Sequence, residues 1–167
     1  MKRSVIIILF LHIILTGISQ KVRLKNIKQQ EFVGTWQWTR GKDTFTIKLI
    51  EDTFYLKYPD TLLHWILGWH KFVQDGKLLE SSYEFTDSIK NKKTTIIGAV
   101  NKGVLICTFR DLSRDRSFRI EMKMLNRRHS KILWTSQFLE DIRINEPPSK
   151  IRGGQTVPSG IILKKIQ

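Results

Sequence analysis

Residues 31–49 read EFVGTWQWTRGKDTFTIKL, and this stretch decides the fold. Apolar and polar side chains alternate in its second half, where the apolar positions are Phe45, Ile47 and Leu49. A period of two is typical of a β-strand with one buried face. The Arg-Gly-Lys segment at 40–42 separates two such runs, as a hairpin turn does. The stretch therefore predicts two antiparallel strands joined by a tight turn.

The same period recurs along the rest of the chain. Further strands are expected at 54–58, 68–74, 77–85, 94–100, 104–109, 117–125, 131–137 and 161–166. Glu51-Asp52 is expected to be a turn, and Leu62 to Leu67 a loop or a short helix. The pattern predicts an all-β domain over residues 31–167. In it, an antiparallel up-and-down meander of about eight to ten strands forms a small barrel or a clam-like sandwich.

The region at 139–159 lacks a regular period and contains Pro147-Pro148 and Gly153-Gly154. Irregular segments of this length are uncommon in compact domains unless they cover something. We therefore expect an irregular flap here. The apolar segment that follows, from Ile161 to Ile166, is expected to pair back as the closing strand of the sheet.

The N-terminus has the pattern of a secretory signal. Lys2 and Arg3 precede an apolar run from Val5 to Leu15, and small residues come before Gln20. This run is shorter than the roughly 20 residues that a membrane span needs. We expect a signal peptide at 1–19, cleaved between Ser19 and Gln20, then a basic leader at 20–30. Because no cysteine follows to carry a lipid anchor, the protein is expected in the periplasm or outside the cell.

Cysteine usage and charge limit the partners. Cys107 is the only cysteine, so an intramolecular disulfide is excluded, and its apolar neighbours predict a buried strand residue.

The formal charge of +14 falls to +12 when the signal is removed with its two cations. Such a surplus attracts anions. For an exported monomer we expect a small apolar or anionic ligand, or an anionic surface such as polysaccharide or lipid headgroups, and no nucleic acid.

Gly34-Thr35-Trp36 resembles the Gly-x-Trp signature of lipocalins and related calycin barrels. The resemblance implies that Gly34 and Trp36 are structural residues at one barrel end. In true lipocalins an arginine from near the last strand packs across this tryptophan, and Arg143 is the candidate for that place.

A broader resemblance covers nearly the whole chain. The signal ending at Ser19-Gln20, the stretch quoted above, the Asn-Lys-Gly hairpin at 101–103 and the ending VPSGIILKKIQ resemble a family of small exported Bacteroidetes proteins that is classed as a domain of unknown function. This resemblance implies export and an all-β fold. It brings no catalytic residues.

No catalytic or metal motif is recognisable in the sequence, which contains no HExxH, CxxC, GxSxG or Walker-type loop. On an extended strand, His64 and His70 would lie roughly 20 Å apart, too far to share a metal. Glu80 and Glu84 lie on one strand face and would suit an acid and a base, although a structural role fits them better. We therefore expect no enzyme activity, no cofactor and no metal.

Two sets of residues are candidates for binding. If the barrel encloses a ligand, its lining is expected from Trp38, Phe45, Phe54, Met122, Met124 and Trp134. The methionines alternate with charged residues, which fits either a packed core or an adaptable ligand surface. In a simple meander alternate turns share one end, and this predicts a basic rim of Arg40, Lys42, Lys90, Lys92, Lys93, Arg114 and Arg116.

Three functions are compared, of which we expect the first and keep the second as the alternative. A non-enzymatic binding module would hold a small apolar or amphipathic ligand in a barrel cavity. An interaction protein would instead have a filled core, and its basic surface would contact anionic polysaccharide, lipid headgroups or another protein. A hydrolase or isomerase would need a cleft with converging polar groups.

Overall fold

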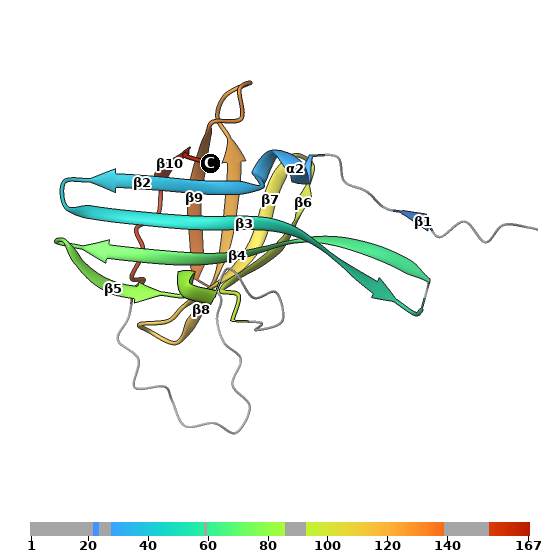
Figure 1. Cartoon of the computed structure of the whole chain (residues 1–167), viewed down its shortest axis with the longest axis horizontal. Coiled ribbons are helices and arrows are strands. Elements are labelled where there is room, and N and C mark those ends of the chain that lie inside the picture. The colour runs from blue at the N-terminus through green and yellow to red at the C-terminus, as the bar shows by residue number, and fades with distance from the viewer. Residues whose placement is uncertain (1–21, 24–27, 59, 86–92, 139–153) are drawn as a thin grey trace, which may run out of the picture.

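The computed structural model describes residues 22–23, 28–58, 60–85, 93–138 and 154–167 (Figure 1). The expected signal peptide, most of the expected basic leader and most of the expected flap lie outside these residues. The described elements are β1 (Val22–Arg23), α2 (Gln29–Phe32), β2 (Gly34–Arg40), β3 (Asp43–Leu56), β4 (Thr61–Gln74), β5 (Lys77–Ser81), the 3-10 helix η1 (Tyr83–Phe85), β6 (Ile96–Asn101), β7 (Val104–Asp111), β8 (Arg116–Met124), β9 (Lys131–Phe138) and β10 (Ile161–Lys165).

Eight antiparallel strands close into a barrel. Their order is β4-β3-β2-β10-β9-β8-β7-β6, and β6 pairs back onto β4 at Ile66–Gly98, Leu67–Ile97 and Gly68–Ile96. In Figure 1, β2, β3 and β4 run across the view and β8 and β9 run up it. The strand β5 forms a hairpin on β4, and β1 adds a short parallel pairing to β4. The predicted all-β, up-and-down fold is confirmed, as a closed barrel.

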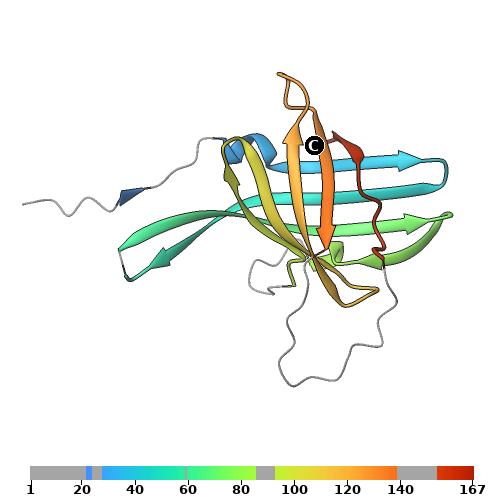
Figure 2. The same ribbon diagram turned by 180° about the vertical axis from the view of Figure 1, so that it is seen from behind.

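The last strand completes the barrel, as the sequence predicted. The strand β10 lies between β9 and β2, with Ile161 opposite Trp134 and Lys165 opposite Trp36 (Figure 2). The first and last strands of the barrel are therefore direct neighbours. A full set of strand partners removes the exposed edge that an open sheet would present.

The strands β3 and β4 are each 14 residues long and extend beyond the barrel. Beyond Leu49, the last residue of β3 that pairs with β2, the two strands form a protruding hairpin, which we call the arm (residues 50–65). The predicted turn at Glu51-Asp52 is wrong, because this pair lies inside β3. The predicted loop or helix at Leu62 to Leu67 is also wrong, because it forms part of β4.

The arm changes the role of Phe54. The sequence placed this ring inside the barrel, but it lies on the outer face of the arm, 43% exposed, with its centroid 6.4 Å from that of Trp65. The alternation of side chains was predicted correctly. The strand has left the barrel at this point, so neither face meets the core.

Aromatic side chains fill the barrel interior. The ring centroid of Trp134 lies 5.1 Å from that of Phe45 and 5.4 Å from that of Phe109, and His70 lies 4.9 Å from Phe109. These rings meet edge to face, the arrangement that aromatic quadrupoles favour. Cys107 is buried in the same core, as predicted. Among the described residues, no helix is long and apolar enough to cross a bilayer.

Candidate functional site

Trp36 closes one end of the barrel, which we call the tryptophan end (Phe32, Trp36 and helix α2). Trp36 is fully buried, and its Nε1 donates a hydrogen bond to the Phe32 carbonyl oxygen at 2.8 Å. The Lys165 ammonium lies 5.1 Å from the centroid of the Trp36 ring and donates to the Glu31 carbonyl oxygen at 3.5 Å. A cation from the last strand therefore does pack across the tryptophan. It is Lys165, whereas the proposed Arg143 lies outside the described residues.

Gly34 makes this closure sterically feasible. Its φ is +128°, and a β-carbon added there would come within 2.4 Å of the Gln167 carbonyl oxygen. Only glycine combines this backbone conformation with such a close approach. The chain after β10 can therefore cross over the start of β2, where Thr35 donates its N–H to the Gln167 carbonyl oxygen at 2.8 Å.

The opposite end is closed by polar groups, and we call it the histidine end (His70, Glu80, Thr95 and Asp111). His70 is fully buried. Its Nε2 lies 2.9 Å from Glu80 Oε1, and its Nδ1 lies 2.7 Å from Thr95 Oγ1. Ser82 Oγ continues the chain at 3.0 Å from Thr95 Oγ1. This network lies where β4 exchanges its partner β5 for β6.

The two carboxylates of the histidine end have pKa shifts in opposite directions. Burial opposes ionisation of Glu80, but hydrogen bonds from His70 and from the Ser113 N–H at 2.7 Å outweigh it and lower the pKa. Burial raises the pKa of Asp111, and the nearby charge of Glu80 adds to the rise. The hydrogen bonds that Asp111 accepts from Thr156 reduce this rise without cancelling it.

The network has the connectivity of a hydroxyl–histidine–carboxylate relay. In hydrolases such a relay activates a serine or threonine nucleophile. Here, however, Thr95 and Ser82 are both buried, so neither hydroxyl is presented to a substrate. Glu84 is exposed and accepts a hydrogen bond from Ser81 at 2.8 Å, while Glu80 bonds to His70, so the two do not form an acid–base pair. The arrangement fits a structural tie between β4, β5 and the β7–β8 turn.

A concave site opens at the same end, where β8 and β9 leave the barrel; we call it the mouth. It has a volume of about 270 Å³, and its lining is Arg116, Phe118, Phe138, Gly154 and Gln155. The guanidinium of Arg116 lies 5.2 Å from the centroid of the Phe138 ring, which in turn lies 5.8 Å from that of Phe118. Ser136 donates a hydrogen bond to the Gln155 side-chain oxygen beside it. The mouth thus combines aromatic walls with one cation and one amide.

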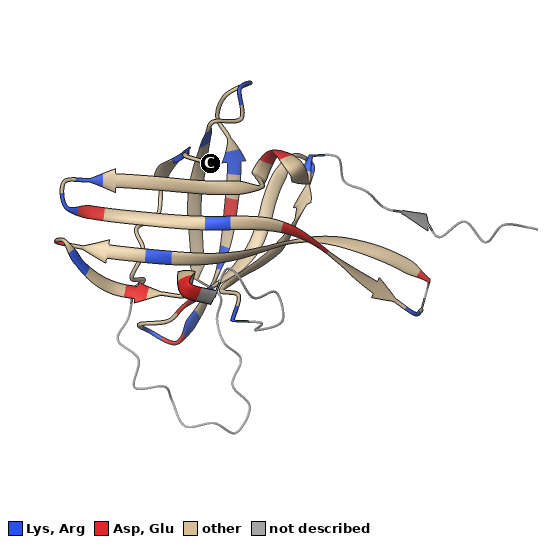
Figure 3. Cartoon of the chain, in the orientation of Figure 1, with Lys and Arg blue, Asp and Glu red and all other residues tan. Residues whose placement is uncertain are grey.

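The predicted rim residues divide into two groups. Arg40, Lys42, Lys93, Arg114 and Arg116 lie at or beside turns of the histidine end, whereas Lys90 and Lys92 lie outside the described residues. Acidic side chains alternate with these cations, as at Arg40, whose guanidinium lies 3.9 Å from Asp43 (Figure 3). In a simple meander a turn at 59–64 would also belong to this end, but residues 61–64 lie in β4, within the arm, at the tryptophan end. The part of the rim described here is therefore mixed in charge, and Arg116 alone of its residues lines the mouth.

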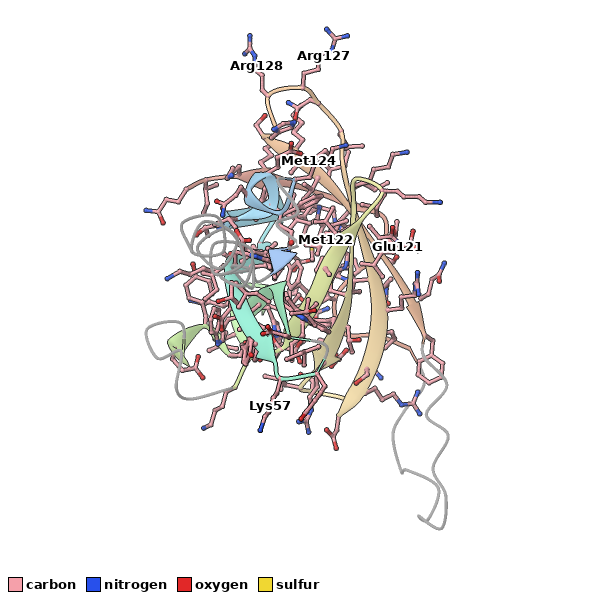
Figure 4. The ribbon with its side chains drawn as sticks, turned by 90° about the vertical axis from the view of Figure 1, so that its right-hand side faces the viewer. Lys57, Glu121, Met122, Met124, Arg127 and Arg128 are labelled. Carbon is pink, nitrogen blue, oxygen red and sulfur yellow. The ribbon has the colours of Figure 1, made fainter. Side chains whose placement is uncertain are left out.

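Five of the six expected lining residues point inward but do not surround an open space, and the sixth, Phe54, lies on the arm. Phe45, Met122 and Trp134 are fully buried and packed in the core, and Met124 is partly buried against it. Figure 4 shows both methionines on the inner side of β8, opposite Glu121. Trp38 is half-buried beneath the guanidinium of Arg40, at 5.6 Å. The sequence analysis did not predict the mouth. The one local signal for it was that Phe118 shares the inward face of its strand with Met122.

The fold and the mouth define the class of protein: a small closed antiparallel β-barrel with an aromatic core and a concave site at one end. The chain belongs to a family of unknown function, DUF6705, whose sequence profile matches residues 1–166. No curated protein matches the chain significantly, and no solved structure does. Among the described residues, no group of three or more His, Cys, Asp or Glu side chains is placed to hold a metal ion.

Proposed function

We propose that this protein is an exported, monomeric, non-enzymatic binding module that takes a small amphipathic anion at its mouth. The observation that carries this proposal is the lining of the mouth, where the Arg116 guanidinium stands beside two aromatic rings. A carboxylate or phosphate would meet the guanidinium, and an apolar body would lie on Phe118 and Phe138.

The size of the mouth limits the ligand. Sites for drug-sized molecules usually enclose roughly 300–1,000 Å³. The mouth, at about 270 Å³, suits a smaller molecule such as a short acyl chain or a single ring. The core adds no space, because its ring centroids lie only 5 to 6 Å apart, as between Trp134 and its neighbours Phe45 and Phe109. The ligand is therefore held at the end of the barrel and stays partly open to solvent.

Native mass spectrometry of the mature protein, isolated from the cells that make it, tests the proposal most directly. We expect a bound molecule of low mass that is lost on denaturation. In titrations, octanoate is expected to bind and octanol, which has a similar chain without the charge, to bind more weakly. Replacing Arg116→Gln should weaken octanoate binding by about tenfold, the equivalent of one charge-assisted hydrogen bond.

Arg119→Gln is the matched control, because Arg119 lies on the same strand but on the outer face of the barrel, where it pairs with Glu121 at 3.5 Å. This variant should bind octanoate as the unchanged protein does. Equal binding of octanoate and octanol, or equal losses in the two arginine variants, would refute the proposed site.

A further inference from the structure

The arm carries large apolar side chains at its tip, far from the core. Phe54 is 43% exposed, Tyr55 53%, Leu56 41% and Tyr58 85%. Single exposed apolar residues are ordinary on protein surfaces. Here four within five consecutive residues lie on a hairpin that projects away from the barrel (Figure 1), and together they make its tip apolar.

These side chains occupy both faces of the hairpin. Phe54 and Leu56 lie on the face that continues the outside of the barrel, whereas Tyr55 lies on the face that continues its inside. A flat protein partner would cover one face and leave the other in water. A medium that surrounds the tip, such as the interfacial layer of a bilayer, covers both. Tyrosine and other aromatic residues are enriched at that depth.

The backbone of the arm suits shallow insertion. Up to the Leu56–Thr61 pair, the two strands of the arm are hydrogen-bonded to each other. In the barrel, β3 pairs with β4 on one edge and with β2 on the other. Because β2 begins at Gly34, opposite Leu49, the second edge of β3 has no strand partner in the arm among the described residues. Unpaired backbone groups are costly in hydrocarbon. The tip therefore fits the headgroup region and the upper acyl chains, not the bilayer centre.

The charges at the tryptophan end favour an anionic surface. Lys57 is the only charged residue between Phe54 and Tyr58. The arm leaves the barrel at this end, where the β6–β7 turn carries exposed Lys102 and the β8–β9 turn carries exposed Arg127 and Arg128. Figure 4 looks onto this side of the molecule, with Lys57 at one edge and the two arginines at the other.

The acidic side chains of the arm are already engaged. Glu51 Oε1 lies 2.8 Å from His64 Nδ1, and Asp60 accepts a hydrogen bond from the Tyr55 hydroxyl at 2.6 Å. Asp52 accepts a hydrogen bond from the Thr53 N–H at 2.7 Å. These contacts draw the carboxylates back toward the arm. The arm itself carries these three acids and one lysine, and the exposed cations of this side lie on the β6–β7 and β8–β9 turns.

We propose that the arm is a membrane-binding element: its tip inserts into the interface of an anionic bilayer, and the turn cations contact the lipid headgroups. Apolar burial supplies one part of such binding and attraction to anionic lipid the other. The proposal does not depend on the mouth, which lies at the opposite end. A molecule bound to lipid in this way keeps its mouth open to the aqueous side.

Co-sedimentation with vesicles tests the proposal on the full mature chain. We expect binding to mixed phosphatidylglycerol–phosphatidylcholine vesicles and much weaker binding to pure phosphatidylcholine. The double variant Leu56→Ser/Tyr58→Ser should reduce the binding constant by about tenfold or more, because two apolar side chains no longer enter the interface. The matched control is Leu78→Ser/Leu79→Ser, which changes two exposed leucines on β5, away from the arm.

Charge is tested separately. Arg127→Gln/Arg128→Gln should weaken binding to the anionic vesicles and reduce its dependence on salt. Arg40→Gln/Lys42→Gln removes the same charge from the histidine end and should have a smaller effect. Thermal melting confirms that each variant is folded. All of these positions are exposed, so little loss of stability is expected.

Two results would overturn the proposal. The first is equal binding of the arm variant and the β5 variant to anionic vesicles. The second is self-association, seen as a dimer in sedimentation equilibrium without lipid that the arm variant dissociates. That result would assign the tip to a second copy of the chain.

Discussion

The two ends of the barrel are closed by different kinds of side chain. The tryptophan end is closed by a large apolar ring, with one hydrogen bond from Trp36 Nε1 and a lysine above it. The histidine end is closed by a network of ionisable and hydroxyl groups around His70. An apolar plug depends on volume and shape, whereas a polar plug depends on every partner being present. Loss of side-chain volume should therefore destabilise the tryptophan end most, and loss of a hydrogen-bond partner the histidine end.

The largest effect is expected at the tryptophan end. Trp36→Ala should lower the free energy of unfolding by on the order of 3 to 5 kcal/mol, because it leaves a cavity beside Phe32 and removes the ring under Lys165. Urea denaturation measures this loss. Trp36→Phe keeps much of the apolar volume and loses the Nε1 hydrogen bond, so it should cost clearly less. Near wild-type stability of the alanine variant would contradict a buried plug.

Removing one partner from the polar plug is expected to cost nearly as much. Glu80→Ala leaves His70 Nε2 and the Ser113 N–H without their acceptor and should cost about 3 kcal/mol. Glu84→Ala changes an exposed carboxylate on η1, a few residues further on, and should stay within about 0.5 kcal/mol of the unchanged protein. The contrast between the two glutamates is read from the same denaturation curves. Similar costs at both would mean that the buried network adds nothing specific.

The pH dependence of stability should arise more from the histidine end. The pKa of Glu80 is lowered, so its stabilisation is present at neutral pH and is lost as the pH falls below 4.5, the ordinary value. The pKa of Asp111 is raised, so its ionised form destabilises the folded state at neutral pH. This destabilisation is relieved as the pH falls toward 3.8, the ordinary pKa of an aspartate. Glu80→Gln should make the acid limb of the stability curve shallower.

Asp111→Asn should act in the opposite direction to Glu80→Gln. This variant loses the gain on acidification, so its stability should decline from a higher pH than that of the unchanged protein. Unfolding free energies measured from neutral to acidic pH separate the two carboxylates. Parallel curves for both variants would mean that the two groups do not titrate as the structure indicates.

The smallest effect is expected at the lysine above the tryptophan. Lys165→Met keeps the aliphatic stem over Trp36 and removes the cation, which should cost about 0.5 to 1 kcal/mol. Lys165→Arg keeps a cation at the ring and should restore most of this stability. A methionine variant as stable as the unchanged protein would reduce Lys165 to a packing residue.

The sequence predicted the barrel better than it predicted the arm or the histidine end. Period two and turn residues identified most strands, including β10 as the closing strand, since these signals are local. The arm was missed because Glu51-Asp52 looks like a turn, whereas Glu51 in fact pairs with His64, 13 residues along the chain. The relay around His70 was missed for a similar reason. It depends on how β5, β6 and the β7–β8 turn meet in space, which no short stretch of sequence encodes.

The place of β10 between β9 and β2 sets an order of events in time. Strands β2 to β9 can form their hairpins one after another, because each pairs with a neighbour in sequence or with one made shortly before it. The seam between β2 and β10 joins residues more than 120 positions apart, as at the Trp36–Lys165 pair. Closing so long a loop is entropically slow, so ring closure should be a late step in folding. Until then, the incompletely folded chain presents two open strand edges, the form of the protein most exposed to chaperones and to misassembly.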